Sequence, residues 1–136
     1  MTSLPVDGRP GWHGQSISQR LISNFSIVGR SVLYSAPAGR AGLEEAKASL
    51  DLYAEIAANV GDGKSAFVLI EDLADFSGIE FSARQLVLER FSSTNRLLGV
   101  VFCNASTLMD IMIRLARRFN RGGQQEIGRA SCRERV

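Results

Sequence analysis

Four acidic residues follow a short apolar run near the middle of the chain. Residues of this type at this spacing could bind a metal ion, transfer protons or bind a partner. The run AFVLI (66–70) is followed by Glu71, Asp72, Asp75 and Glu80. Open α/β sheets usually carry their sites at the carboxyl ends of the strands. Carboxylates at such a place can hold a magnesium ion, transfer protons or present charge to a partner. The competing interpretation is that they only solvate an exposed loop.

A magnesium site of the kind found in phosphoacceptor receiver domains needs a further aspartate at the end of the next strand. That strand ends in VVFCNAS, where Cys103 and Asn104 stand instead of an aspartate. We therefore expect no metal and no other cofactor.

Two further motifs suggest chemistry and have simpler interpretations. GDGKS (61–65) ends like a phosphate-binding loop, but Ala58 stands where that motif needs glycine, so we interpret the segment as a polar turn. A reactive thiolate at Cys103 would need a cationic neighbour or a helix amino terminus. A buried structural cysteine is the simpler expectation, and a small enzyme or ligand-binding domain using Cys103 and the acidic segment is the alternative.

Hydrophobic periodicity predicts strands that alternate with helices. We expect residues 1–23 to be a flexible leader and residues 24–125 to be one α/β domain. The expected elements are a hairpin over 24–39, helices over 42–59, 81–96 and 106–119, and strands over 66–70 and 97–103. The order β-β-α-β-α-β-α predicts a mostly parallel central sheet flanked by helices, cut off before a further strand. The unpaired sheet edge would then favour self-association.

The last eleven residues, EIGRASCRERV (126–136), do not continue this pattern. Their codons can be written so that they look like a common short-read sequencing adapter translated in one frame, so we interpret them as an artefact. Without this segment's three arginines and two glutamates, the chain's 16 basic and 14 acidic residues become 13 and 12. A near-neutral domain gives no electrostatic reason to expect nucleic acid or an anionic membrane as a partner. No apolar run is long enough to span a membrane, and we expect a cytoplasmic protein.

The stretch from SVLYSAPAGRAGLEEAKASLDL through FVLIEDLADFSGIEFSARQ to LLGVVFCNASTLMDIMIRLARRF resembles a STAS-like module at the amino terminus of bacterial signalling proteins. There it precedes PAS, histidine-kinase or diguanylate-cyclase regions. STAS domains of anti-sigma-factor antagonists carry a phosphorylatable serine at a helix start after an acidic residue. In this chain Glu80 fits the acidic position, Phe81 stands at the serine position, and Ser82 follows one residue later.

The resemblance implies a non-catalytic sensory or protein-interaction module of a signal-transduction protein, which docks other signalling domains or proteins. We expect the partner-binding residues to be Asp72, Asp75, Glu80 and Arg84. A free-standing switch of the anti-sigma-factor-antagonist type is the alternative that the resemblance adds. Regulation by phosphorylation at Ser82 or Ser77 is a further possibility.

Overall fold

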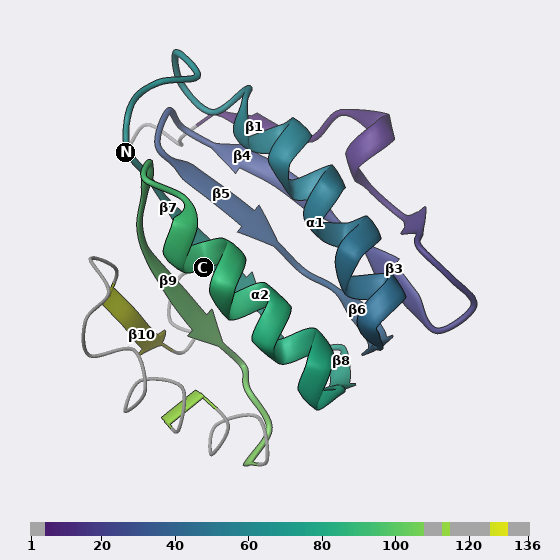
Figure 1. Ribbon diagram of the computed structural model, residues 1–136. Coiled ribbons are helices and arrows are strands. Elements are labelled where there is room, and N and C mark those ends of the chain that lie inside the picture. The colour runs from purple at the N-terminus through teal and green to yellow at the C-terminus, as the bar shows by residue number, and fades with distance from the viewer. Residues whose placement is uncertain (1–4, 108–112, 115–125, 131–136) are drawn as a thin grey trace.

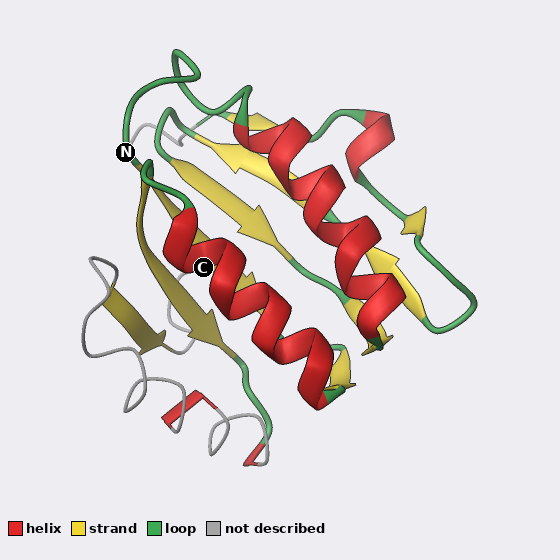
Figure 2. Ribbon diagram, in the orientation of Figure 1, coloured by secondary structure: helices red, strands yellow, loops and turns green. Residues whose placement is uncertain are grey.

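Two helices lie side by side across one face of a six-stranded sheet (Figure 1). The computed structural model describes residues 5–107, 113–114 and 126–130. Figure 2 separates the helices from the strands that they cover. No helix in these described ranges combines the length and the apolar character that a membrane span requires.

The large sheet is mixed, with an antiparallel half and a parallel half. The hairpin of β4 and β5 is antiparallel, as is the pairing of β1 with β4, whereas β5, β7, β9 and β10 run parallel to one another. Its strands, in spatial order, are β1 (Val6–Asp7), β4 (Phe25–Val28), β5 (Val32–Ser35), β7 (Phe67–Asp72), β9 (Leu97–Cys103) and β10 (Glu126–Ala130).

A second, four-stranded sheet lies beside the first and was not expected. Its strands, in spatial order, are β2 (Gln15–Ser16), β3 (Leu21–Ser23), β6 (Ala38–Ala41) and β8 (Phe76–Ile79). The pairings of β2 with β3 and of β3 with β6 are antiparallel, and β6 runs parallel to β8. Strands of two to four residues are too short to show a period-two pattern.

The helices bury one apolar face each against the large sheet. Gly42 is the N-cap residue of helix α1 (Leu43–Ala57), and Glu80 is the N-cap residue of helix α2 (Phe81–Ser93). The core between the helices and the sheet contains mainly leucine, isoleucine and aromatic side chains: Phe25, Leu33, Leu50, Tyr53, Ile56, Phe67, Leu69 and Phe91. The expected hairpin, both of these helices and both central strands are therefore confirmed.

Two expectations about the architecture need correction. The central sheet is mixed rather than mostly parallel, because β1 adds a second antiparallel pairing to that of the β4–β5 hairpin. The expected leader contains β1, β2, β3 and a short 3-10 helix (Pro10–Trp12), and the Trp12 side chain is buried in the core. The Gly- and Pro-rich composition of this segment suggested flexibility. The single large apolar side chain of tryptophan is nevertheless enough to hold the segment against the core.

The edge of β9 is paired in the structure. We expected an unpaired edge here, but β9 pairs in parallel with β10, which lies within the segment that we interpret as adapter-derived. Strand pairing uses main-chain groups that almost any sequence supplies, so the pairing does not depend on the origin of these residues. Most of the expected third helix lies outside the described residues; Thr107, Ile113 and Arg114 are helical.

Arg96 closes the carboxyl end of α1, and its loss should be measurable. Its guanidinium donates hydrogen bonds to the carbonyl oxygens of Ala57 (2.8 Å), Val60 (3.0 Å) and Ser65 (3.0 Å). We expect Arg96→Ala to lower the free energy of unfolding by about 2 kcal/mol, because charged hydrogen bonds to helix-end carbonyls are lost. Urea denaturation of this variant and of Lys64→Ala, an exposed control in the same turn, would measure it. Equal effects of the two substitutions would contradict this role.

Candidate functional site

The acidic segment is divided between the interior and the surface. Glu71 and Asp72 are both half-buried, but Glu71 lines a cavity, whereas Asp72 stands at the end of β7. The Asp72 carboxylate accepts hydrogen bonds from the Tyr34 hydroxyl, from Asn104 Nδ2 (3.0 Å) and from the amide of Ala74 (3.1 Å). Burial alone would raise the pKa of Asp72, but these hydrogen bonds outweigh it and hold the pKa below its ordinary value. Asp72 therefore joins three segments of the chain.

The exposed residues Asp75 and Ser77 lie on the side of the small sheet. The main-chain carbonyl of Asp75 accepts a hydrogen bond from the amide of Gly39 (3.0 Å). The hydroxyl of Ser77 donates to the carbonyl of Gly39 (2.9 Å). Both contacts hold β8 against β6, and the Asp75 side chain is left at the surface.

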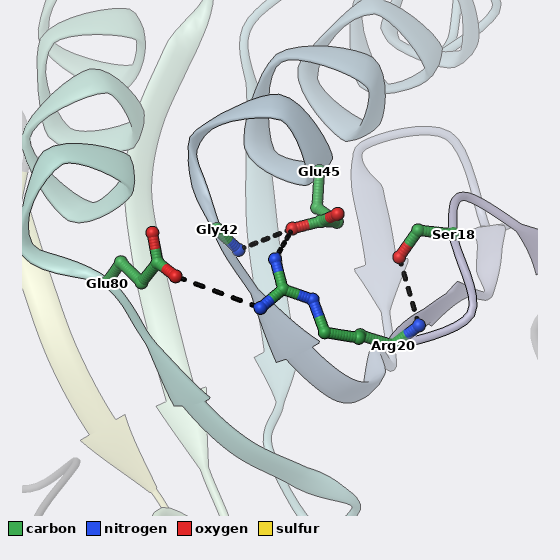
Figure 3. Close-up of polar contacts among 5 residues, drawn as sticks. All are labelled: Ser18, Arg20, Gly42, Glu45 and Glu80. Carbon is green, nitrogen blue, oxygen red and sulfur yellow. Dashed lines mark hydrogen bonds and ion pairs between the residues drawn. The ribbon is translucent and has the colours of Figure 1, made fainter.

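Arg20 connects the first turns of both helices (Figure 3). Its Nη2 atom lies 2.6 Å from Glu45 Oε1, and its Nη1 atom lies 3.8 Å from Glu80 Oε1. Glu45 also accepts a hydrogen bond from the amide of Gly42 (2.9 Å), which caps α1. That bond and Arg20 hold the pKa of Glu45 below its ordinary value. Because Arg20 fell in the expected leader, sequence reasoning missed this contact.

The first turn of α2 presents an aromatic ring to solvent. Phe81 is 62% exposed, and the guanidinium carbon of Arg84 lies 4.9 Å from the centre of its ring. Ser82 is exposed in the same turn. Glu80, Phe81 and Arg84 therefore form one continuous surface, which we call the α2-start surface. Of the four expected partner-binding residues, it contains Glu80 and Arg84.

A cavity of about 130 Å³ lies beneath the two helices. The large sheet, the small sheet and both helices contribute to its wall, which is mostly apolar. Its polar lining residues are Ser35, Ser49, Tyr53, Glu71 and Arg84, and its apolar lining includes Phe25, Leu50, Phe76, Ile79, Val87, Leu88, Phe91 and Phe102.

The polar side of this cavity contains an acid and a phenol. Burial raises the pKa of Glu71 to about 8, a hydrogen bond from Ser35 opposes that shift, and the charge of Asp72 adds to it. Burial and the neighbouring Glu71 also raise the pKa of Tyr53. At neutral pH both groups are therefore mainly uncharged. Tyr53 lies on the buried face of α1, and its hydroxyl on that otherwise apolar face was the signal that sequence reasoning missed.

The remaining candidate motifs take structural roles. In the GDGKS turn, the Asp62 carboxylate accepts hydrogen bonds from the amides of Lys64 (2.8 Å) and Ser65 (2.6 Å), which lower its pKa to about 2. These amides are thus already bonded within the turn. Cys103 is fully buried, and its Sγ atom lies 3.8 Å from the carbonyl oxygen of Glu71. Within the described ranges, no three His, Cys, Asp or Glu side chains are grouped to hold a metal ion.

The comparison with solved structures identifies the fold. The chain is similar to the crystal structure of an uncharacterised protein from the DUF3478 family of Shewanella loihica PV-4, described as having a SpoIIAA-like fold. The match covers 85% of this chain and 89% of that chain, with a TM-score of 0.58 and 15% sequence identity. The fold is SpoIIAA-like.

Comparison of the sequence with protein families and curated proteins does not assign the chain to a family. No family model matches the chain, and no curated protein matches it. At 15% identity the SpoIIAA-like fold is what the two chains share. Fold similarity leaves function to be argued from the sites of this chain.

Proposed function

We propose that this chain is a non-catalytic regulatory module that docks a partner protein through the α2-start surface. The single observation that carries the proposal is the exposed Phe81 ring with Arg84 stacked on it at a helix start. Aromatic and arginine side chains are the residues that contribute most to binding at protein interfaces. The SpoIIAA-like fold supports the same proposal, because STAS-like modules act through partner proteins.

The geometry of the α2-start surface suits docking for a second reason. Arg20 ties Glu80 at the start of α2 to Glu45 at the start of α1. A helix start held in this way loses little conformational freedom when a partner binds. The proposed partner is a protein with an apolar pocket for the Phe81 ring and an acidic group near Arg84.

A crosslinking experiment with a matched control tests this proposal. A photoreactive amino acid would be placed at position 81 and, separately, at Leu98, which is similarly exposed (58%) on β9. In cells that naturally make the protein, we expect position 81 to crosslink to one specific protein. Phe81→Ala should weaken copurification of that protein at least tenfold, because interface aromatic residues of this kind contribute about 2 kcal/mol.

The control variant is Leu98→Ala, which removes an exposed apolar side chain elsewhere and should leave copurification unchanged. Equal losses from Phe81→Ala and Leu98→Ala, or no loss from either, would exclude the α2-start surface as the docking site. Asp75→Ala measures whether the exposed turn before β8 contributes to the same interface.

A further inference from the structure

The cavity beneath the helices contains a buried hydroxyl without a partner. Tyr53 is 4% exposed and lines the cavity, and its hydroxyl has no hydrogen-bond partner within the described part of the chain. A buried hydroxyl in this state costs about 1–3 kcal/mol. Its ring, in contrast, is well packed, with the ring centres of Phe91 and Phe67 at 5.8 Å and 6.5 Å. The ring contributes to the core, and the hydroxyl remains to be explained.

The size and the lining of the cavity limit what could satisfy this hydroxyl. A volume of about 130 Å³ is comparable to the roughly 150 Å³ of an engineered apolar cavity that binds benzene. The wall offers apolar contacts from Phe25, Leu50, Val87 and Phe91 on opposite sides. A molecule of six or seven carbon atoms would therefore fill the space.

We propose that the cavity binds a small, uncharged, mostly apolar molecule, about the size of a six-membered ring, whose single hydroxyl group hydrogen-bonds to Tyr53. This proposal does not depend on the proposed docking function, although Arg84 borders both the cavity and the α2-start surface. The ring of the ligand would contact the apolar wall. Its hydroxyl would face Tyr53 and Glu71.

The charges around the cavity favour an uncharged ligand. A charged group loses its hydration on burial and needs a paired countercharge. Arg84 also lines the cavity, but its guanidinium stacks on the exposed ring of Phe81, with its carbon atom 4.9 Å from the ring centre. Glu71, which is close enough to Tyr53 to affect its pKa, can donate or accept a hydrogen bond in its neutral form.

Four probes of one size test the ligand class on the full chain at pH 7. Phenol, toluene, benzoate and benzylamine would be titrated against the protein and followed by NMR shifts of the cavity-lining residues. We expect phenol to saturate with a Kd below about 1 mM and to bind about tenfold more tightly than toluene, because one hydrogen bond is gained. Benzoate and benzylamine should bind at least tenfold more weakly than phenol. Binding of none of the probes, or tightest binding of a charged one, would overturn the proposal.

Two tyrosine variants show whether the hydroxyl selects the ligand. Tyr53→Phe should lower the affinity for phenol about tenfold, so that it equals the affinity for toluene. The melting temperature of this variant should stay unchanged or rise. Tyr34→Phe is the matched control: its hydroxyl bonds to Asp72 outside the cavity, so phenol affinity should be unchanged and the melting temperature should fall. A merely structural Tyr53 hydroxyl would lower the melting temperature of Tyr53→Phe and leave phenol affinity unchanged, which would overturn the proposal.

A cavity-filling variant tests the location independently. Ala46→Leu adds three carbons to a residue of the wall and should abolish binding of both phenol and toluene. Should this variant fail to fold, Val87→Phe fills the same space from α2. Unchanged phenol affinity in a folded filling variant would place the binding outside the cavity and overturn the proposal.

Discussion

Replacing Gly39 with alanine is expected to lower the free energy of unfolding by about 3–5 kcal/mol. Gly39 lies in β6 with φ at +112°, a conformation that residues with a side chain rarely adopt. A Cβ atom built there would lie 1.9 Å from the carbonyl oxygen of Arg20. The main chains of β3 and β6 would have to separate to relieve that contact.

The consequences of this substitution extend beyond the strand pair. The Arg20 carbonyl accepts a hydrogen bond from the amide of Arg40 (2.8 Å), so separating the strands breaks that bond and shifts Arg20. The contacts from Arg20 to Glu45 and Glu80 would be lost with it. We therefore expect Gly39→Ala also to loosen the start of α2.

Urea denaturation monitored by circular dichroism measures the stability change, with the dependence on denaturant expected to stay constant. Gly11→Ala is the matched control, because a Cβ atom there meets nothing within 4 Å. We expect that control to change stability by less than about 0.5 kcal/mol. A loss for Gly39→Ala as small as that of the control would show that β3 and β6 do not approach each other this closely.

The long, periodic elements of the fold could be predicted from the sequence. Helix α1 carries its apolar residues at three- and four-residue spacing, and β7 is a short, continuous apolar run. Each of these patterns is local, so a single segment is sufficient to reveal it. The small sheet shows no such pattern, because its strands have two to four residues and are stabilised by pairing with segments far apart in sequence.

The candidate site could be predicted only in part, for a related reason. Because Glu71 and Asp72 are adjacent in the sequence, sequence reasoning treats them as one acidic group. In the structure, successive side chains of a strand point to opposite faces, so Glu71 lines the cavity and Asp72 bonds to Tyr34 and Asn104. The position of Glu71 and Tyr53 in the wall of the same cavity depends on how α1 packs on β7, which no local pattern encodes.

The α2-start surface and the cavity share one structural element. Helix α2 presents Phe81 to solvent at its first turn and lines the cavity with Val87 and Phe91 further along. A change in how α2 packs on the sheet would therefore affect both places. This arrangement gives the two proposals a physical link, although each has its own test.

The protonation of Glu71 should make the stability of the protein fall as the pH rises. The pKa of Glu71 is raised from 4.5 to about 8 in the folded protein, chiefly by burial. Below about pH 4.5 the carboxyl is protonated in both the folded and the unfolded state, and its stabilising contribution is fully present. Between about pH 4.5 and 8 the unfolded chain is ionised while the folded chain retains the proton. The free energy of unfolding then falls by at most about 1.4 kcal/mol per pH unit, and it levels off above pH 8.

Glu71→Gln isolates this contribution, because an amide of nearly the same shape does not ionise. Between pH 5 and pH 9, we expect the free energy of unfolding of the variant to increase by about 3 kcal/mol relative to that of the wild-type protein. This value is reduced for the partial exposure of the carboxyl. Urea denaturation at four or more pH values measures the difference, and all other titrating groups are common to both proteins. Glu55→Gln, which changes an exposed carboxyl on α1, should follow the wild-type profile. Parallel profiles for Glu71→Gln and the wild type would mean that Glu71 is ionised in the folded state, and the polar side of the cavity would then carry a negative charge suited to a cationic ligand.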